Sequence, residues 1–600
     1  MKNYISFFKV NLILSVLFSI LNVSFAADVS CVAFILSFIF NISFIYFSYV
    51  FLLKDVNVNR LKVLRYFLQY EPFVFFICFV LRRSGQFSTS YLFDVFSIVL
   101  WILIFICSFL LQRKLDPKRF YKSFNLKMIE EPLSKRLIAQ DKAKFKKVSA
   151  VTYLKSTSLV ILDWIDAIIQ AIFLVFLVQV FVFQLYKIPS ESMVPEFMIN
   201  DRVCVNKLTC GPKFPLTSVG LPQLKKYERG DLVVFRNPHY KIDRKSDVKF
   251  YISQIVNMLT FTMVNINVDE NGVMKADPLV KRITGVPGEQ LMMQDGILYK
   301  RTSENNKFIP VEEDSKWAVY NLNEENPQLQ NMIQDFKISQ EGYDALISVE
   351  KERNNLDIEF LKSKCINIAK TFSKYSYGKN TSCTDSQLKE LFSNTDLFEY
   401  SICSNYINFI QRLMTMENGS LWFSKFMTDW ISKYDSLLVD DLIGGDLYSD
   451  ANFKLNLMFK YYLGELTVKI AQIIYEGNSF IDKTSDDAKI IQNYEYKLSY
   501  LHNYAFFLDR RNMPVFPPND NSGNPQYIPE DCYFMMGDNR FNSLDMRHSD
   551  KDSLKKITPF DDYSLTYYSN IEPRYVPNNL ILGTSMIRYW PLIRPVRNKN

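Results

Sequence analysis

The chain has 600 residues, of which 48% are hydrophobic and 22% charged, and its formal net charge is +7. This apolar content excludes global disorder, and the 18 Gly and 9 Cys exclude collagen-like and disulfide-dense proteins. The length suffices for several domains. The chain contains only three histidines, His239, His502 and His548, so a His-based catalytic triad or a His-rich metal site has few residues to draw on.

Apolar runs of membrane length dominate the first third of the chain. A helix that crosses a bilayer needs about 20 apolar residues. Four runs meet this length, and a fifth is weaker because it is shorter and contains Glu71 and Pro72. The four are 7–26, 31–53, 91–111 and 167–185, and the weaker one is 67–81. We therefore predict membrane helices with basic loops over 1–158 and a last transmembrane anchor over 159–186.

Basic residues between these runs predict an orientation. Residues 112–156 hold 13 Lys or Arg against four Asp or Glu, and residues 54–65 hold four against one. Because cytoplasmic loops are enriched in Lys and Arg, both segments are expected inside and everything after Leu185 outside. Arg82 and Arg83 fall on the outer side, against this rule. We interpret the longer basic loop as a solvated segment near anionic lipid, not as a nucleic-acid patch.

The first apolar run has two interpretations. Lys2 and Lys9 accompany an apolar stretch that ends in Ser24-Phe25-Ala26, the small-x-small pattern of a secretory cleavage site. Residues 1–26 are therefore either a removed signal peptide or a retained first span. Both alternatives leave residue 27 on the outer side.

A polar segment, Lys187 to Pro195, follows the last span directly. Pro189 and Pro195 exclude a regular helix across it, and Ser190 and Ser192 would point the same way in an extended chain. A serine pair alone fits an ordinary linker equally well. Strand-like runs follow at 231–235 and 279–289, then a hairpin at 294–299 with Asp-Gly at its turn, and later a loop at 537–547 dense in charged and hydrogen-bonding groups.

Taken in order, these segments resemble the four sequence boxes of type I signal peptidases. Residues 189–196 are similar to PSxSMxPT, with Glu191 where Gly is usual and Glu196 where Thr is usual. Residues 229–235 resemble RGDxVVF, and 280–289 resemble xKRxxGxPGD. Residues 528–547 resemble VPEGxYFxMGDNRDNSxDSR, with Phe541 replacing Asp and Met546 replacing Ser. The resemblance covers 163–318 and 511–595, about 40% of the chain.

The resemblance implies a catalytic pair, with Ser192 as nucleophile and Lys281 as general base. A lysine must be neutral to accept the serine proton, and burial in an apolar setting lowers its pKa towards that condition. A Ser/Lys dyad also explains how a chain with three histidines could perform acyl transfer. The Ser190 hydroxyl and the Ser192 N–H are implied to stabilise the oxyanion.

Further residues receive supporting roles from the same resemblance. Ser543 is expected to hydrogen-bond and orient Lys281, and Gly537 to permit close backbone approach. Asp545 is expected to form an ion-pair cluster with Arg547 and Arg282. Pro189 and Met193 are expected to contact substrate.

The implied activity is that of a membrane-bound serine endopeptidase that cleaves signal peptides from exported preproteins after small-x-small motifs, without metal or cofactor. The implied location is the bacterial inner membrane, multi-pass, with the catalytic domain on the outer side. Expected partners are preprotein signal peptides, the lipid bilayer and the secretion machinery, and no nucleic acid. The alternative is a catalytically inactive homologue that acts as a membrane-anchored binding module through its insertion.

The expected fold is a multi-domain membrane protein with N-terminal transmembrane α-helices, a mostly-β signal-peptidase-like core and a large α-helical insertion. The core comprises 187–318 and 511–600, and the insertion 319–510. Apolar residues recur at helical spacing over 459–473, before Gly477, and over 401–416 and 490–507. Residues 250–264 are expected to form either an interfacial helix near the bilayer, or a core helix or docking face for the insertion. Cys204 and Cys210 could form a disulfide or remain thiols.

Overall fold

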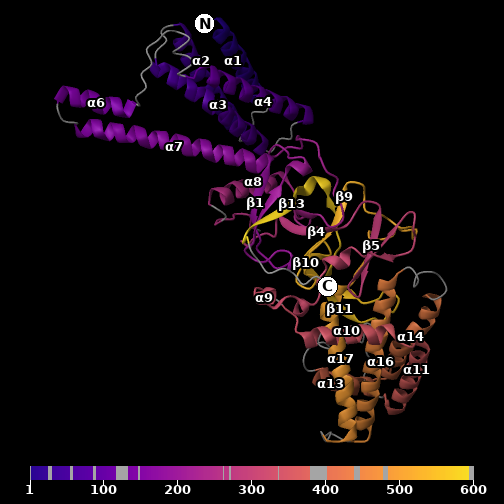
Figure 1. Ribbon diagram of the computed structural model, residues 1–600. Coiled ribbons are helices and arrows are strands. Elements are labelled where there is room, and N and C mark those ends of the chain that lie inside the picture. Colours follow the sequence, from indigo (N-terminus) through magenta and orange to yellow (C-terminus); the bar gives the residue numbers. More distant parts are fainter. Residues whose placement is uncertain are drawn as a thin grey trace.

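The computed structural model describes residues 2–23, 30–53, 58–85, 90–116, 133–145, 149–260, 263–268, 272–335, 337–378, 402–437, 446–477 and 484–592. The predicted cleavage motif at 24–26 lies outside these residues. Figure 1 shows three parts in line: a helical bundle that includes the N-terminus, a sheet-rich core, and a helical insertion at the opposite end.

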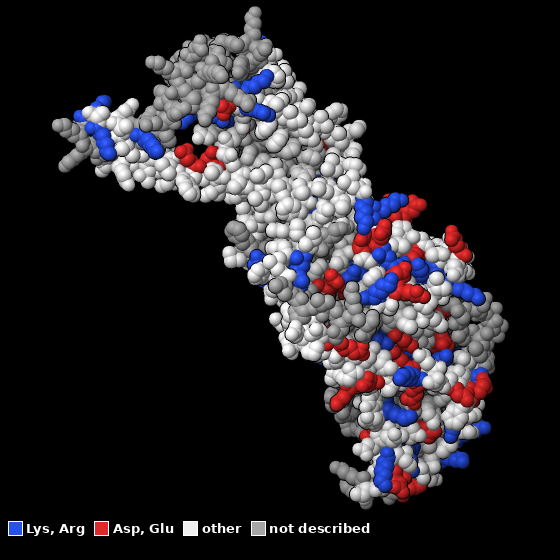
Figure 2. All heavy atoms as spheres, in the orientation of Figure 1, with Lys and Arg blue, Asp and Glu red and all other residues white. Residues whose placement is uncertain are grey.

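Within its described residues, the first part contains six helices. They are α1 (Lys2–Val23), α2 (Ser30–Leu53), α3 (Val58–Ser84), α4 (Tyr91–Lys114), α6 (Leu133–Phe145) and α7 (Ala150–Phe181). In the part of the chain that the structure describes, four segments are long and apolar enough to cross a membrane: Cys31–Val50, Arg60–Ser84, Tyr91–Lys114 and Ala150–Phe181. Helix α1 contributes a shorter apolar segment, Ile5–Leu21. The middle of this part carries almost no charged side chains in Figure 2, whereas the core and the insertion carry both signs densely.

Two predicted span boundaries are wrong. The weak run at 67–81 lies inside the much longer helix α3, which continues through Pro72. The helix of the predicted last anchor, α7, ends at Phe181. Residues 183–187 instead form strand β1 (Phe183–Lys187), which pairs antiparallel with β2 (Arg202–Asn206). Val182, Phe183 and Leu185 extend the apolar run of α7 into strand β1, which is only partly buried.

Helix α1 packs inside the bundle. The rings of Phe18 and Phe75 stack with centroids 5.0 Å apart, and Asn11 Nδ2 donates a 2.7 Å hydrogen bond to the Glu71 carboxylate. Ser15 and Ser108 donate to the same carboxylate, which is fully buried. The polar residue that weakened the sequence prediction for α3 is therefore satisfied by α1 and α4.

The core is built around a seven-stranded antiparallel sheet. Its order is β1, β2, β13 (Ile581–Trp590), β3 (Leu232–Phe235), β4 (Leu279–Gly285), β9 (Cys532–Met536) and β12 (Val576–Pro577). Helix α8 (Arg244–Leu259) lies between β3 and β4 in the chain and beside the end of the bundle (Figure 1). Val233 pairs with Lys281, and Arg282 pairs with Met536, so β4 lies inside the sheet, between β3 and β9.

A second sheet has the order β7 (Ile309–Pro310), β6 (Ile297–Thr302), β5 (Glu289–Gln294) and β8 (Met513–Phe516). The predicted β5–β6 hairpin is confirmed: Asp295 and Gly296 have φ values of 53° and 82°, and Gln294 pairs with Ile297. Positive φ at both central residues is the requirement that Asp-Gly meets. The insertion leaves this sheet after β7 and returns at β8, beside β5.

Helices form the insertion, as predicted. They are α9 (Pro327–Gln330), α10 (Gln340–Asn354), α11 (Ile358–Tyr375), α13 (Ile402–Thr415), α14 (Gly419–Leu437), α16 (Leu447–Tyr475) and α17 (Asp486–Arg511). Gly477 follows α16 with φ 78°. The ribbon of β10 (His548–Lys556) and β11 (Thr566–Ile571), which we assigned to the catalytic core, shares one apolar cluster with these helices through Ile557, Leu565 and Tyr567.

Candidate active site

The side chains of Ser192 and Lys281 are in contact at strand β4 of the seven-stranded sheet. Lys281 projects from β4, and Ser192 lies in the turn between β1 and β2. The Lys281 Nζ and Ser192 Oγ atoms are 2.5 Å apart. The two residues are 89 positions apart in sequence, and the antiparallel sheet brings them into hydrogen-bond contact.

Burial lowers the pKa of the Lys281 amine. Lys281 is 2% exposed and Ser192 is 9% exposed. Burial lowers the pKa of Lys281 from 10.5 to about 8, and Asp545 partly opposes this shift by favouring the ammonium. A substantial fraction of the amine is therefore neutral near physiological pH, as a general base requires.

Two hydrogen-bond donors lie beside the serine oxygen. The Ser190 hydroxyl donates to Ser192 Oγ over 3.4 Å, and Ser190 itself is exposed. Among the hydrogen bonds of the described residues, the backbone N–H of Ser192 donates to no acceptor. An N–H without an acceptor next to a buried nucleophile is available to a developing oxyanion.

The loop after β9 holds the serine turn in place. The backbone N–H of Asn539 donates to the Ser192 carbonyl over 3.2 Å, and its side-chain amide donates to the Glu191 carbonyl over 3.2 Å. Gly537 has no room for a side chain, because a Cβ there would overlap both Ser543 Oγ and the Ser192 carbonyl oxygen. The close backbone approach that we predicted at Gly537 is present.

Among the described residues, Ser543 forms a hydrogen bond with Asp545 and not the predicted one with Lys281. Its hydroxyl donates to Asp545 Oδ2 over 2.8 Å, since a carboxylate is a stronger acceptor than an amine. The same Oδ2 accepts the Gly537 N–H over 2.9 Å. Arg547 pairs with Asp545 through Nε and Nη2 at 2.8 and 2.9 Å, and this pairing holds the pKa of the buried carboxyl well below its usual range.

The predicted cluster of Asp545, Arg547 and Arg282 is wrong in one member. Arg282 binds Asp538 instead, with Nε–Oδ1 and Nη2–Oδ2 distances of 2.8 and 2.6 Å. The reason is strand alternation: Lys281 and Arg282 are neighbours in β4, so their side chains leave opposite faces. Arg282 also lies 5.0 Å from the ring centroid of Trp317.

Pro189 and Met193, which we predicted to contact substrate, differ in their exposure. Pro189 is exposed beside Ser190. Met193 is 1% exposed and packs in an apolar cluster with Ile188, Phe197 and Val203. Met193 therefore anchors the serine turn to the core, and its contact with substrate stays a prediction.

Two of the four departures from the family pattern, Glu191 and Phe541, contact the insertion. Glu191 is buried, and its Oε1 accepts the backbone N–H of Gln334 over 2.5 Å. Phe541 is 6% exposed and packs edge-on against three insertion rings, with centroid separations of 5.8, 6.3 and 5.6 Å to Tyr320, Tyr343 and Phe507. The other two departures do not follow this pattern: Glu196 lies 3.7 Å from Arg282, and Met546 packs in the apolar core of the sheet.

Sequence reasoning missed two supports of the site. Asn539 stood in the recognised box without a role, although it fixes both carbonyls of the serine turn. Arg540 forms a buried pair with Asp314, with Nη1 and Oδ2 2.9 Å apart, and Val319 pairs with Asn539 as an isolated parallel bridge. Asp314 carried no sequence signal, because its partner lies 226 positions away.

The cysteines of the core are thiols. Cys204 and Cys210 are free, and the Cys210 thiol donates to the Lys207 carbonyl over 3.1 Å. Cys365 and Cys532 are also free and buried.

The chain matches the family model for signal peptidase, peptidase S26, over residues 161–350 and 482–590. These ranges contain the serine turn, β4 and the loop after β9. The intervening segment, 351–481, falls within the helical insertion.

Individual relatives agree with the family model. The chain is 24% identical to a signal peptidase I of Haemophilus influenzae over 38% of this chain and 61% of that one. It is 32% identical to one of Buchnera aphidicola over 16% and 28%, and 28% identical to signal peptidase I P of Bacillus subtilis over 23% and 50%. The chain thus spans less than two thirds of each of these relatives. No solved structure matches it.

Proposed function

The chain belongs to the type I signal peptidase family, and from this premise we propose that it is a membrane-bound serine endopeptidase that removes N-terminal signal peptides from exported preproteins through a Ser192/Lys281 dyad. The observation that carries the proposal is the 2.5 Å contact between Ser192 Oγ and the buried Lys281 amine, whose pKa is lowered to about 8.

In the proposed acylation step, neutral Lys281 accepts the Ser192 proton while Oγ attacks the carbonyl carbon of the scissile peptide bond. The resulting oxyanion accepts hydrogen bonds from the Ser192 N–H and the Ser190 hydroxyl. Protonated Lys281 then gives its proton to the leaving amine, and an acyl-enzyme on Ser192 remains.

In the proposed deacylation step, Lys281 takes a proton from water, which attacks the ester carbonyl. Ser192 leaves and recovers its proton from Lys281, and the signal peptide departs with a free carboxylate. Asp545 and Arg547 transfer no proton in this scheme. They hold Gly537 and Ser543 against the serine turn.

Strand β4 offers a place for the substrate. It pairs with β3 from Leu279 to Arg282, whereas its register with β9 begins at Arg282. Within the described residues, the other backbone edge of 279–281 has no strand partner. We propose that the preprotein adds there as an extended segment, so that residues three before and immediately before the cut face shallow pockets that admit only small side chains.

The proposed location follows from the apolar helices. The four candidate spans would hold the sheet core at the surface of a bacterial inner membrane, on the outer side, where exported preproteins emerge. Tethering of this kind raises the effective concentration of a membrane-bound substrate.

The test is cleavage of a purified preprotein, with Ala at both small positions, by the full-length protein in detergent. We expect cleavage at the junction by the wild type and a loss of at least about 10⁴-fold in both Ser192→Ala and Lys281→Met. Ser303→Ala and Lys307→Met, at exposed positions between β6 and β7, should retain full activity. A preprotein with Leu at both small positions should stay intact.

Two outcomes would contradict the proposal. Cleavage that survives both dyad substitutions would place the nucleophile elsewhere. A folded wild-type protein that binds the preprotein without cutting it would favour the alternative, an inactive binding module.

A further inference from the structure

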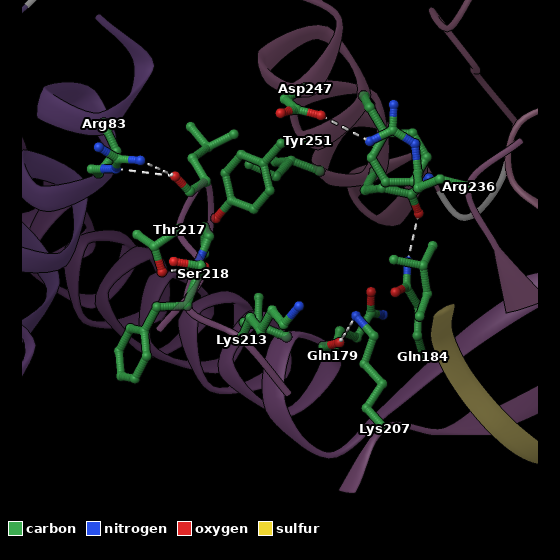
Figure 3. A pocket seen from close by; sticks show the side chains of 18 of the residues that line it. Arg83, Gln179, Gln184, Lys207, Lys213, Thr217, Ser218, Arg236, Asp247 and Tyr251 are labelled. Atoms are coloured by element: carbon green, nitrogen blue, oxygen red, sulfur yellow. Dashed lines mark hydrogen bonds and ion pairs between the residues drawn. The ribbon is translucent and has the colours of Figure 1, made fainter. Parts of the chain in front are cut away.

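A pocket of about 520 Å³ lies between the helical bundle and the sheet core. It is bounded by the ends of α3 and α7, by the loop 207–218 and by α8. It is separate from the dyad, since neither Ser192 nor Lys281 lines it. Figure 3 shows Arg83, Lys207, Lys213 and Arg236 arranged around this space.

The pocket has an excess of positive charge. Five cationic side chains line it, against one carboxylate, Asp247, which pairs with Arg236 at 3.1 Å. Among the described residues, Lys207, Lys213 and Arg244 form no ion pair with any carboxylate. Lys207 Nζ is held by the Gln179 carbonyl at 3.1 Å, and burial lowers the pKa of this lysine to about 8.

Two guanidinium groups converge on one backbone oxygen. Arg83 Nη2 and Arg244 Nη1 donate to the Leu216 carbonyl over 2.8 and 3.0 Å. Leu216 has φ 58°, a backbone conformation that non-glycine residues rarely adopt. Like charges held together in a partly buried place destabilise each other unless an anion lies between them. Arg83 has Asp94 as a partner, with Nη1 and Oδ2 3.5 Å apart, whereas Arg244 has no carboxylate partner among the described residues, so an excess positive charge remains at the Leu216 turn.

The remaining wall of the pocket is apolar and includes one unpaired hydroxyl. Phe176 and Val180 of α7 and Phe250 and Ile255 of α8 supply the apolar part. The buried Tyr251 hydroxyl has no hydrogen-bond partner among the described residues. In Figure 3 it points towards the segment of Thr217 and Ser218, on the side of the pocket where Arg83 lies.

We propose that this pocket binds the phosphate headgroup of an anionic phospholipid, with an acyl chain against the apolar wall. The phosphate would accept hydrogen bonds from Lys213, Arg244 and the Tyr251 hydroxyl. This assignment goes beyond the peptidase activity and does not depend on it.

The position of the pocket favours a lipid over a free phosphate ion. α3 and α7 are candidate membrane spans, and the pocket lies at the ends of both helices that adjoin the sheet core. Headgroup phosphates occupy this level of a bilayer, and basic pockets between transmembrane helices suit them. Ile252 and Leu259 of α8 are 45% and 49% exposed, so the helix beside the pocket also presents apolar side chains outward.

The test is thermal unfolding of the full-length protein in detergent, titrated with dihexanoyl phosphatidylglycerol. Dihexanoyl phosphatidylcholine and inorganic phosphate serve as parallel probes. We expect phosphatidylglycerol to raise Tm in a saturable manner, and the other two to need at least about tenfold higher concentration for the same shift. An equal response to inorganic phosphate would identify a free-ion site, and an equal response to phosphatidylcholine would exclude anionic recognition. Either result overturns the proposal.

Arg244→Gln separates ligand binding from structural support. Because it relieves repulsion with Arg83, we expect an unchanged or higher Tm without lipid, together with a response to phosphatidylglycerol weakened at least about tenfold. Lys245→Gln, the exposed neighbour on α8 with the same loss of charge, should respond like the wild type. A lower Tm of Arg244→Gln without lipid, an intact response, or an equal loss in Lys245→Gln would each refute the site.

Discussion

The sheet core and the helical insertion meet at the loop after β9, but they contribute to the site in different ways. The core supplies each group that the proposed chemistry uses, from three segments that a short motif can identify. The insertion supplies contacts to the backs of those segments. Val319, Leu322 and Leu329 pack against Val194 of the serine turn, and Phe541 is enclosed by insertion rings.

The insertion is attached to the core at two further places. At the β5–β6 turn, Arg511 of α17 donates from Nη2 to the Asp295 carbonyl over 2.8 Å, and the Gly296 N–H donates to the Arg511 carbonyl over 2.7 Å. In the β10–β11 ribbon, Asp561 pairs with the buried Lys460 of α16 at 2.5 Å. The insertion residues that contact the serine turn lie inside the ranges that match the family model, 161–350 and 482–590, whereas Lys460 lies outside them and binds the β10–β11 ribbon.

The largest effect should come from within the core. Gly537→Ala places a methyl group against Ser543 Oγ and the Ser192 carbonyl, so the serine turn must move away from Lys281. A displacement of about 1 Å can reduce activity by about 10²-fold. We expect at least this loss in kcat for preprotein cleavage. Gly523→Ala, in open space with φ 84°, should leave kcat unchanged. Full activity in Gly537→Ala would show that the turn does not need this close approach.

The contact between the core and the insertion at Phe541 is tested by Phe541→Asp, which restores the residue usual in the family. A carboxylate would replace a ring that is 94% buried among aromatic side chains, so we expect the free energy of unfolding to fall by about 3 kcal/mol or more. Denaturant unfolding in detergent measures this. Phe506→Asp, at a neighbouring ring that is 78% exposed, should cost less than about 1 kcal/mol. Equal losses in both variants would contradict a packed junction.

Lys281→Met should stabilise the folded protein while it removes activity. The pKa of the lysine is lowered from 10.5 to about 8 on folding, so the unfolded chain binds more protons between these values and wild-type stability rises with pH across that window. Below pH 8 the buried ammonium costs roughly 3 kcal/mol, which methionine avoids. We expect a higher unfolding free energy for the variant at pH 7 and a smaller difference at pH 9.5. A less stable variant at pH 7 would argue against a strained ammonium.

The smallest effect concerns the link from the insertion to the serine turn. Glu191→Ala removes the acceptor for the Gln334 N–H, and we expect kcat to fall about tenfold with little change in KM, because Glu191 acts through the turn and not on substrate. Glu196→Ala, at a side chain that is 47% exposed, should change kcat less than about twofold. A raised KM with unchanged kcat in Glu191→Ala would indicate direct contact with substrate instead.

Much of the core could be predicted from sequence, and the reasons are local. The Asp295-Gly296 turn and the strands at 232–235 and 279–285 depend on patterns of a few residues, whereas the Ser192/Lys281 pair was implied by the resemblance to a family. The pairing choices in the charged loop could not be predicted. Which acid binds Arg282 depends on the face of β4 from which it projects, and which group Ser543 binds depends on competition between a carboxylate and an amine.

Local sequence patterns also could not predict where the last long apolar helix ends or which buried ion pair supports the loop after β9. Apolar residues at 182–185 fit a helix or a strand, and pairing with β2 decides between them. Asp314 and Arg540 are 226 positions apart, so nothing near either residue predicts the pair. Glu191 and Phe541 depart from the family motif, and the motif alone does not predict that both contact the insertion.

The central claim, that a neutral buried lysine activates Ser192, is tested most directly by the pH dependence of kcat/KM for preprotein cleavage. Lys281 must lose its proton to act as a base, so the account predicts that log kcat/KM rises with a slope of one and levels off above about pH 8. A profile that is flat from pH 6 to 9, or one that levels off near pH 6.5 as a histidine base would give, would contradict it.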